Sequence, residues 1–207
     1  MQITLSTLKA ANTCAAVKDL RYYLQGVLIE FIASAVDTAT EKAAIVCGTD
    51  GHVLFAARTV VDLADGENAP EKGTQIIVPY DVIRAAKLRH KANPFVDLIQ
   101  ISETQWQLGD TLFRPIDGKF PDYRRVIPDR SDVISKAQEP GNFNPELLTR
   151  ARDALRLHRN DRNLRPATYQ RGVYSAVLHD ERNDAVVVVM PMREDFTPAR
   201  YQGLNLA

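Results

Sequence analysis

Asp50 and His52 come closest, by residue type and spacing, to a catalytic or metal-binding pair in this chain. A carboxylate and an imidazole could share acid–base chemistry or hold a metal ion, but either task needs a third group positioned beside them. No such group is evident, and Asp50-Gly51 has the composition of a tight hairpin turn. The other histidines are scattered among charged residues without the spacing of metal ligands: His90, His158 and His179.

Motifs that carry catalysis elsewhere do not occur in the sequence. There is no phosphate-binding loop, zinc-protease helix, nucleophile elbow or dinucleotide fingerprint. Cys14 and Cys47 lie in separate apolar segments, which predicts buried free thiols rather than a disulfide or a zinc site. We therefore expect a protein that is not an enzyme and that has no cofactor and no metal.

Basic residues recur at helical spacing in two segments, one following Pro79 and one following Asn144. When Asp81 is aligned with Glu146, Lys87 matches Arg152 and Lys91 matches Arg156. Together with Arg84 and Arg159, these residues form basic stripes at helical spacing. One such stripe is typical of a solvated face, but its recurrence favours a shared role toward phosphate groups. Because 26 basic residues balance 26 acidic ones, a nucleic-acid surface must be local.

Three similar units must position these residues, each with a strand, a short helix and further strands ending in a turn. In the first unit the sequence pattern predicts strands at 2–5, 26–31, 43–47 and 53–57, with a helix over 6–18. The second predicts strands at 74–78 and 95–99, a helix from Pro79 and a hairpin at Gly109-Asp110. The third predicts a helix from Asn144 to about Arg159, strands at 173–178 and 185–189, and an Asn183-Asp184 turn.

Five stretches of the chain carry a resemblance to a known family. They are Asp-Leu-Arg-Tyr-Tyr-Leu-Gln-Gly at 19–26, Thr-Asp-Gly-His at 49–52, Ile-Val-Pro at 77–79, Gly-Lys-Phe-Pro-Asp-Tyr-Arg-Arg-Val-Ile-Pro at 118–128 and Val-Val-Met-Pro-Met-Arg at 188–193. In order and spacing this set resembles the bacterial sliding clamp, the DNA polymerase III beta subunit. The resemblance implies an α+β DNA-clamp fold built from strand-helix-three-strand repeats.

The resemblance also implies a domain organisation. Residues 1–128 are similar to the family's middle domain, and residues 129–193 to the second half of its last domain. Residues 194–207 form a C-terminal tail. The result is one full clamp domain plus a half domain, so the family's usual ring contact cannot be carried over. An unpaired half domain exposes a sheet edge, which favours a homo-oligomer.

In the family, partner peptides enter an apolar pocket between the middle and last domains. The residues that match its lining are Leu24, Thr49, Gly51, His52, Leu54, Pro121, Arg125, Val126, Val188, Met190, Pro191, Met192 and Arg193. Apolar and methionine side chains suit an adaptable peptide receptor, although strand core and turn chemistry alone would also explain these residue types. The family often has an arginine after the histidine of the turn, whereas this chain has Val53.

The resemblance points Arg21, Tyr22 and Tyr23 toward DNA, together with the basic helix positions; packing at a corner is the alternative for the tyrosines. The implied partners are duplex DNA, clamp-binding peptides and a clamp loader. The implied location is the cytoplasm, at the nucleoid and not at a membrane. The implied protein is an accessory subunit of a DNA polymerase complex. The alternative is an interaction module that captures clamp-binding peptides or a resident clamp without encircling DNA.

The tail contains Gln202-Gly203-Leu204-Asn205-Leu206, which loosely resembles a clamp-binding peptide. Such a tail could plug its own pocket at high effective concentration. A frayed terminus without function is the alternative.

Overall fold

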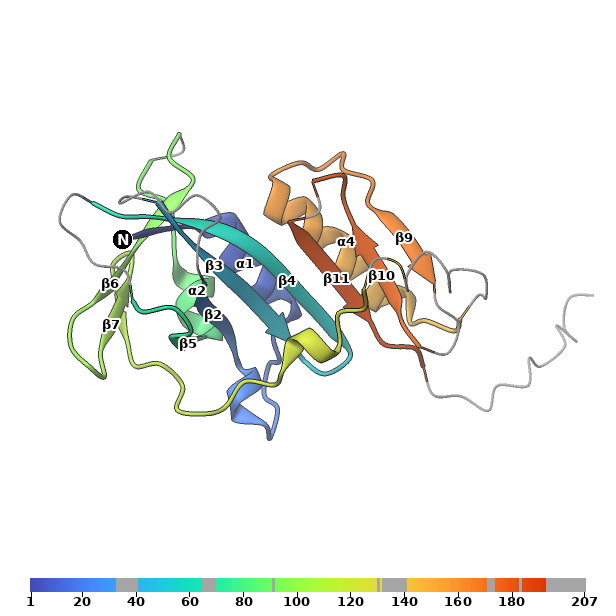
Figure 1. The fold of residues 1–207 in the computed structure, drawn as a ribbon, viewed down its shortest axis with the longest axis horizontal. Helices are drawn as coiled ribbons and strands as arrows, with labels where there is room; N and C mark the ends of the chain where they lie inside the picture. The colour runs from blue at the N-terminus through green and yellow to red at the C-terminus, as the bar shows by residue number, and fades with distance from the viewer. Residues whose placement is uncertain are drawn as a thin grey trace, which may run out of the picture.

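The structure is a computed structural model that describes residues 1–32, 41–64, 70–90, 92–129, 131, 141–170, 174–182 and 184–192. Its elements form three units along the chain (Figure 1). Unit 1 consists of β1 (Gln2–Thr4), α1 (Leu5–Cys14), η1 (Tyr22–Leu24), β2 (Gly26–Ile32), β3 (Glu41–Thr49) and β4 (Val53–Asp62). Unit 2 consists of β5 (Gln75–Pro79), α2 (Tyr80–Ala85), β6 (Phe95–Gln100), β7 (Trp106–Leu108), β8 (Thr111–Phe113) and η2 (Tyr123–Arg125). Unit 3 consists of α4 (Pro145–Arg159), β9 (Ala167–Gln170), β10 (Ala176–His179) and β11 (Ala185–Val189).

Units 1 and 2 exchange their first strands. The first strand of unit 1, β1, pairs antiparallel with β6, the second strand of unit 2. Reciprocally, β5 pairs antiparallel with β2. This exchange gives the sheet order β5-β2-β3-β4-β1-β6-β7-β8.

Unit 3 joins this arrangement through β4. Along one edge β4 pairs with β3 over its whole length. Along the other edge it pairs with β1 near Asp62 and with β11 near its beginning, where Leu54 lies opposite Val188. In Figure 1 the sheet therefore continues from β3 and β4 into β11, β10 and β9, and α1 and α4 lie behind it on the same face.

The core lies between the helices and the sheet because each element alternates or repeats its apolar residues with the matching period. Along β4, Phe55 and Ala57 face the helices, whereas Leu54 and Ala56 face the other side and pack with Phe120. The helix-side core includes residues of all three units, so unit 3 shares it with unit 1.

The structure confirms most predicted elements, including the helix at Pro145–Arg159 and the Gly109-Asp110 hairpin. Asn144 caps that helix by accepting from the backbone N–H of Glu146 at 2.9 Å. The strand β9 was not predicted, because its residues, Ala-Thr-Tyr-Gln, show no buried alternation. Val173, Asn183 and the tail at 194–207 lie outside the described residues, as do most of residues 129–141, with which the predicted half domain begins.

The first of the two remaining helices is shorter than predicted, and the second ends before two of the cations that were assigned to it, Lys87 and Lys91. The first was expected to reach residue 18, but α1 ends at Cys14, and Ala15 is extended. Beyond this point the apolar period fails, since Val17 is 60% exposed. The second ends at Ala85, and residues 87–90 are all exposed, so no packing would stabilise another turn. No helix in the described part of the chain is long and apolar enough to cross a membrane.

Candidate functional site

The junction between β4 and β11 brings together two stretches that lie far apart in the sequence. Thr49, Gly51 and His52 form the turn between β3 and β4, and the strand of Val188 lies alongside. The backbone N–H of Met190 donates to the carbonyl oxygen of His52 at 2.8 Å. Gly51 has φ +90°, a left-handed conformation that glycine adopts without strain, so the Asp-Gly pair is a true turn.

Asp50 holds this turn and ties it to unit 3. Its Oδ1 accepts hydrogen bonds from the backbone N–H groups of His52 at 2.8 Å and Val53 at 3.0 Å. Its Oδ2 forms an ion pair with Arg150 of α4. Burial raises the pKa of the Asp50 carboxyl, but these hydrogen bonds outweigh burial and lower the pKa overall. Asp50 therefore serves as a structural carboxylate.

A second side chain, Arg21, anchors the same turn from the η1 side. It donates to the carbonyl oxygen of Asp50 at 3.0 Å and pairs with Asp19 at 2.7 Å. A side chain at position 51 would meet the Arg21 guanidinium at 2.9 Å, so Gly51 also allows this close approach. The η1 segment, predicted to face DNA, thus lies against the turn predicted to bind peptides.

The residues predicted to bind peptides divide into a buried base and an exposed rim. The buried members are Leu24, Thr49, Leu54 and Val188, each at most 6% exposed. Val126, Met190 and Met192 are each 40% exposed, and Pro121, Arg125 and His52 are also exposed. Pro191 is half-buried, and Arg193 lies outside the described residues. The adjacent Val53, which stands where the family often has arginine, is buried toward the helices.

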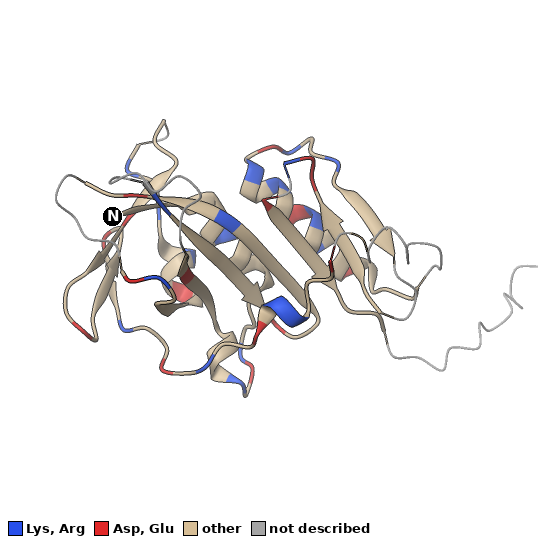
Figure 2. Cartoon of the chain, in the orientation of Figure 1, with Lys and Arg blue, Asp and Glu red and all other residues tan. Residues whose placement is uncertain are grey.

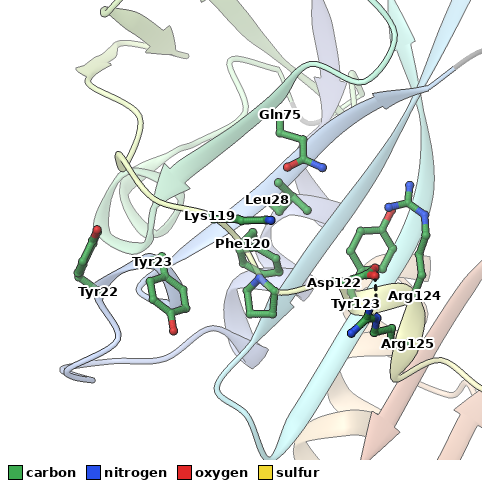
Figure 3. Close-up of a pocket in the computed structure, with 11 residues that line it drawn as sticks. Tyr22, Tyr23, Leu28, Gln75, Lys119, Phe120, Asp122, Tyr123, Arg124 and Arg125 are labelled. Atoms are coloured by element: carbon green, nitrogen blue, oxygen red, sulfur yellow. Dashed lines mark ion pairs between the residues drawn. The ribbon is translucent and has the colours of Figure 1, made fainter.

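A groove of about 860 Å³ lies on the outer face, between the η1 segment and the stretch from Lys119 to Arg125. Figure 3 shows Tyr22 and Tyr23 at one end and Arg124 and Arg125 at the other. The groove contains Pro121 and Arg125 from the predicted peptide site and both tyrosines from the predicted DNA site. The groove therefore brings together two residues of each predicted site.

Gly118 explains how the two tyrosines fit against this groove. A side chain at position 118 would meet the Cβ of Tyr23 at 2.9 Å and the ring of Tyr22 at 3.3 Å. The two rings contact each other edge to face, with centroids 5.7 Å apart. Tyr22 remains 56% exposed and is available to a ligand.

Glu30 anchors the other end of the groove. It accepts hydrogen bonds from the Tyr123 hydroxyl at 2.7 Å and from Arg124 at 2.8 Å. Burial raises the pKa of Glu30, but the two donors outweigh burial and lower it overall. Burial and the bond to Glu30 raise the pKa of Tyr123. This cluster fixes η2 on the sheet.

The basic helix positions do not form the two outward stripes that were predicted. Arg159 is wrong as an outward cation: its side chain is 10% exposed and pairs with Asp180 and Asp184. Its hydrogen bond lowers the pKa of Asp180. Lys87 is exposed but follows the end of α2, so its helical placement is wrong, and Lys91 lies outside the described residues.

The other basic positions sit beside acidic residues or carbonyl groups. Arg84 pairs with Asp81 at 3.0 Å. Arg152 lies 2.9 Å from Asp153, and Arg156 donates to the Leu164 carbonyl at 3.0 Å. Figure 2 shows basic and acidic positions interspersed on α4. Whether these residues contact DNA stays a prediction.

Several residues of this surface were missed in the sequence. Glu30 gave a usable signal, because a charged residue inside an apolar strand requires a buried partner. Arg150 gave none, because its partner Asp50 lies 100 positions away in the sequence. Within the described residues, no group of three or more His, Cys, Asp or Glu side chains could hold a metal ion.

Comparisons with known proteins bear on this geometry. No family model matches the chain. The beta sliding clamp of Escherichia coli K12 is 34% identical over 136 residues, which cover 63% of this chain and 33% of that protein. A crystal structure of the Pseudomonas aeruginosa sliding clamp bound to griselimycin superimposes with a TM-score of 0.60 at 21% identity. That match covers 94% of this chain and 65% of the other.

Over these 136 residues the chain is similar to the bacterial beta sliding clamp, and over most of its length it shares the fold of the clamp structure. The polymerase III beta structure from Caulobacter crescentus matches similarly, with a TM-score of 0.59 at 20% identity over 92% of this chain and 63% of that one. These matches confirm the predicted α+β clamp fold. The alignment to the curated clamps spans about a third of their length.

Proposed function

We propose that the chain is a sliding-clamp-type processivity factor, an accessory subunit of a DNA polymerase and not an enzyme. It would bind duplex DNA without sequence preference and tether replication or repair proteins by a short peptide. The observation that carries this proposal is the β4–β11 junction, where two clamp-like motifs that lie far apart in the sequence meet. A cytoplasmic, nucleoid-associated location follows from the same proposal.

The junction suits a peptide because exposed apolar side chains lie over a rigid base. Met190, Met192 and Val126 supply adaptable apolar contacts, and His52 and Arg125 supply polar ones. Burying two apolar side chains of a peptide is worth about 3–6 kcal/mol before the cost of ordering it. Such a site would hold a tether that can still be exchanged.

DNA contacts would be weak and local. The chain has no net charge, and several predicted cations are paired with acidic residues. Lys87, Tyr22 and Tyr23 remain the best placed groups for phosphate and sugar contacts. Weak contacts of this kind permit sliding along the duplex. A clamp loader would be needed only if the assembly closes around DNA.

The test is binding of a peptide that carries the glutamine-and-leucine motif of clamp-binding proteins. We expect fluorescence anisotropy to show binding that Met190→Ala with Met192→Ala weakens about tenfold or more, since two apolar contacts are lost. Leu112→Ala, which truncates an exposed apolar residue on β8, is the control. Unchanged affinity in the double variant would remove the proposed pocket.

The alternative function is a module that captures clamp-binding peptides or a resident clamp without encircling DNA. The observation that favours this alternative is the exposed edge of unit 3 at β9. Retention on circular duplex DNA that is lost when the circle is cut would support the encircling form. Peptide binding without such retention would support the module.

A further inference from the structure

The second strands of units 1 and 3 differ sharply in their surroundings. In β2, every residue but the last is buried, because β5 of unit 2 covers its outer edge. In β9, no residue is buried, and among the described strands it pairs with β10 alone. With respect to the other described strands, the outer edge of β9 is thus unpaired.

The segment before α4 also lacks a strand partner. Residues 141–144 occupy the position that a first strand holds in units 1 and 2, yet they form no strand. The carbonyl oxygen of Asn142 accepts from Met192 at 2.9 Å, but no backbone hydrogen bond joins Phe143 to another described residue. Residues 129–144 are far too few to contain another unit that could pair with both sites.

Units 1 and 2 show how a first strand and a second strand each find a partner in another unit. Neither first strand pairs with the second strand of its own unit; β1 pairs with β6, and β5 pairs with β2. In both exchanges the residue just before the helix lies opposite the first residue of the sister strand. Thr4 faces Phe95, and Pro79 faces Gly26.

We propose that unit 3 completes itself with unit 3 of a second copy of this chain. Residues 141–144 of each copy would pair antiparallel with β9 of the other about a two-fold axis. The inference specifies the surface of the expected self-association and depends on the fold alone, not on DNA or peptide binding. The observed register places Phe143 opposite Thr168, Asn142 opposite Tyr169 and Gly141 opposite Gln170.

The chemistry of the two edges suits this partner. Neither 141–144 nor Ala167–Gln170 contains a charged residue, so a two-fold pairing brings no like charges together. Within one chain, Gly141 reaches Gln170 only through a bond from its backbone N–H to the side-chain Oε1 at 3.3 Å. An isologous contact between identical surfaces closes after two copies.

Mass measured by light scattering, without DNA or peptide, tests the pairing. We expect an even number of chains per particle, and Thr168→Lys should reduce the number because a lysine on an exposed edge opposes strand addition. Leu112→Lys, on the edge strand β8, is the matched control and should leave the β9 contact intact. Circular dichroism checks that both variants are folded. A single-chain mass at every concentration would overturn the proposal, whether residues 193–207 or solvent covers the edge.

Cross-linking tests the register. Equal amounts of Asn142→Cys and Tyr169→Cys proteins, mixed and oxidised, should give a covalent dimer, because the two side chains lie opposite each other. Asn142→Cys with Thr168→Cys should cross-link far less, since adjacent strand residues point to opposite faces. Cys14 and Cys47 are buried and do not interfere. Equal yields from both mixtures, or none from the first, would contradict the register and with it the proposal.

Discussion

The two joins of unit 1 are built from different chemistry. Its join with unit 2 exchanges whole strands, and Ile3, at the middle of β1, is fully buried between β4 and β6. Its join with unit 3 lays strand edges and helices side by side and adds ionisable groups, with Asp50 bound to Arg150 and Thr7 bound to His158. The Glu30 cluster also adds ionisable groups between units 1 and 2, but the contact made by Ile3 in the exchanged strand β1 depends on apolar burial alone. The contacts of Asp50 and His158 in the join with unit 3 depend on protonation states.

This difference has consequences for stability. Apolar burial is indifferent to pH, whereas a group whose pKa differs between folded and unfolded states makes stability depend on pH. The join with unit 3 also carries the proposed peptide site. A change of pH should therefore act on the proposed peptide site through Asp50 and His158, whereas the burial of Ile3 in β1 should not respond to it.

The largest expected effect comes from the strand exchange. Ile3→Ala removes a fully buried side chain and should cost about 2–5 kcal/mol of unfolding free energy. The loss, measured by urea denaturation, should be the same at pH 6 and pH 8. Val60→Ala, at a residue that is 42% exposed on the neighbouring strand, is the control and should cost much less. A loss that varies strongly with pH would erase the distinction between the joins.

Asp50→Asn should have an intermediate effect, about 1–2 kcal/mol, because the amide oxygen can still accept from the turn but the ion pair is lost. The folded pKa of Asp50 lies below its unfolded value of 3.8. Its stabilisation is therefore complete well above pH 4 and is lost as the pH falls through the folded pKa. Acid denaturation should show wild type and variant converging at low pH. Curves separated by a constant amount would contradict this assignment.

His158→Gln should have the smallest effect, visible only in the pH profile. Burial, with help from the Arg159 charge, lowers the pKa of His158, while Asp184 and Asp180 oppose this shift. Because the unfolded chain takes up the proton first, wild-type stability should fall as the pH drops below about 6.5. The variant should lack this slope while keeping its stability near pH 8. An identical slope in both proteins would show that His158 does not titrate as described.

The sequence predicted what depends on local pattern and motif. The apolar period and Asn144 cap predicted α4 nearly to the residue, and Asp50-Gly51 predicted its turn. It could not predict that Arg159 turns inward, because a basic residue on a helix looks the same whether solvent or two aspartates face it. The groove could not be predicted either, since Tyr22 and Arg125 come to line one groove only through the tertiary fold.

The arrangement along β4 also determines how the molecule bears force. One edge of this strand holds β11 at Val53–Ala57 and β1 at Val61–Asp62, end to end. Tension between units 2 and 3 would pass lengthwise along β4, so the ladder hydrogen bonds on either side would be sheared together rather than peeled one at a time. Pulling on a peptide bound at the proposed site, with unit 2 held in place, would thus load the strand that is paired along both edges.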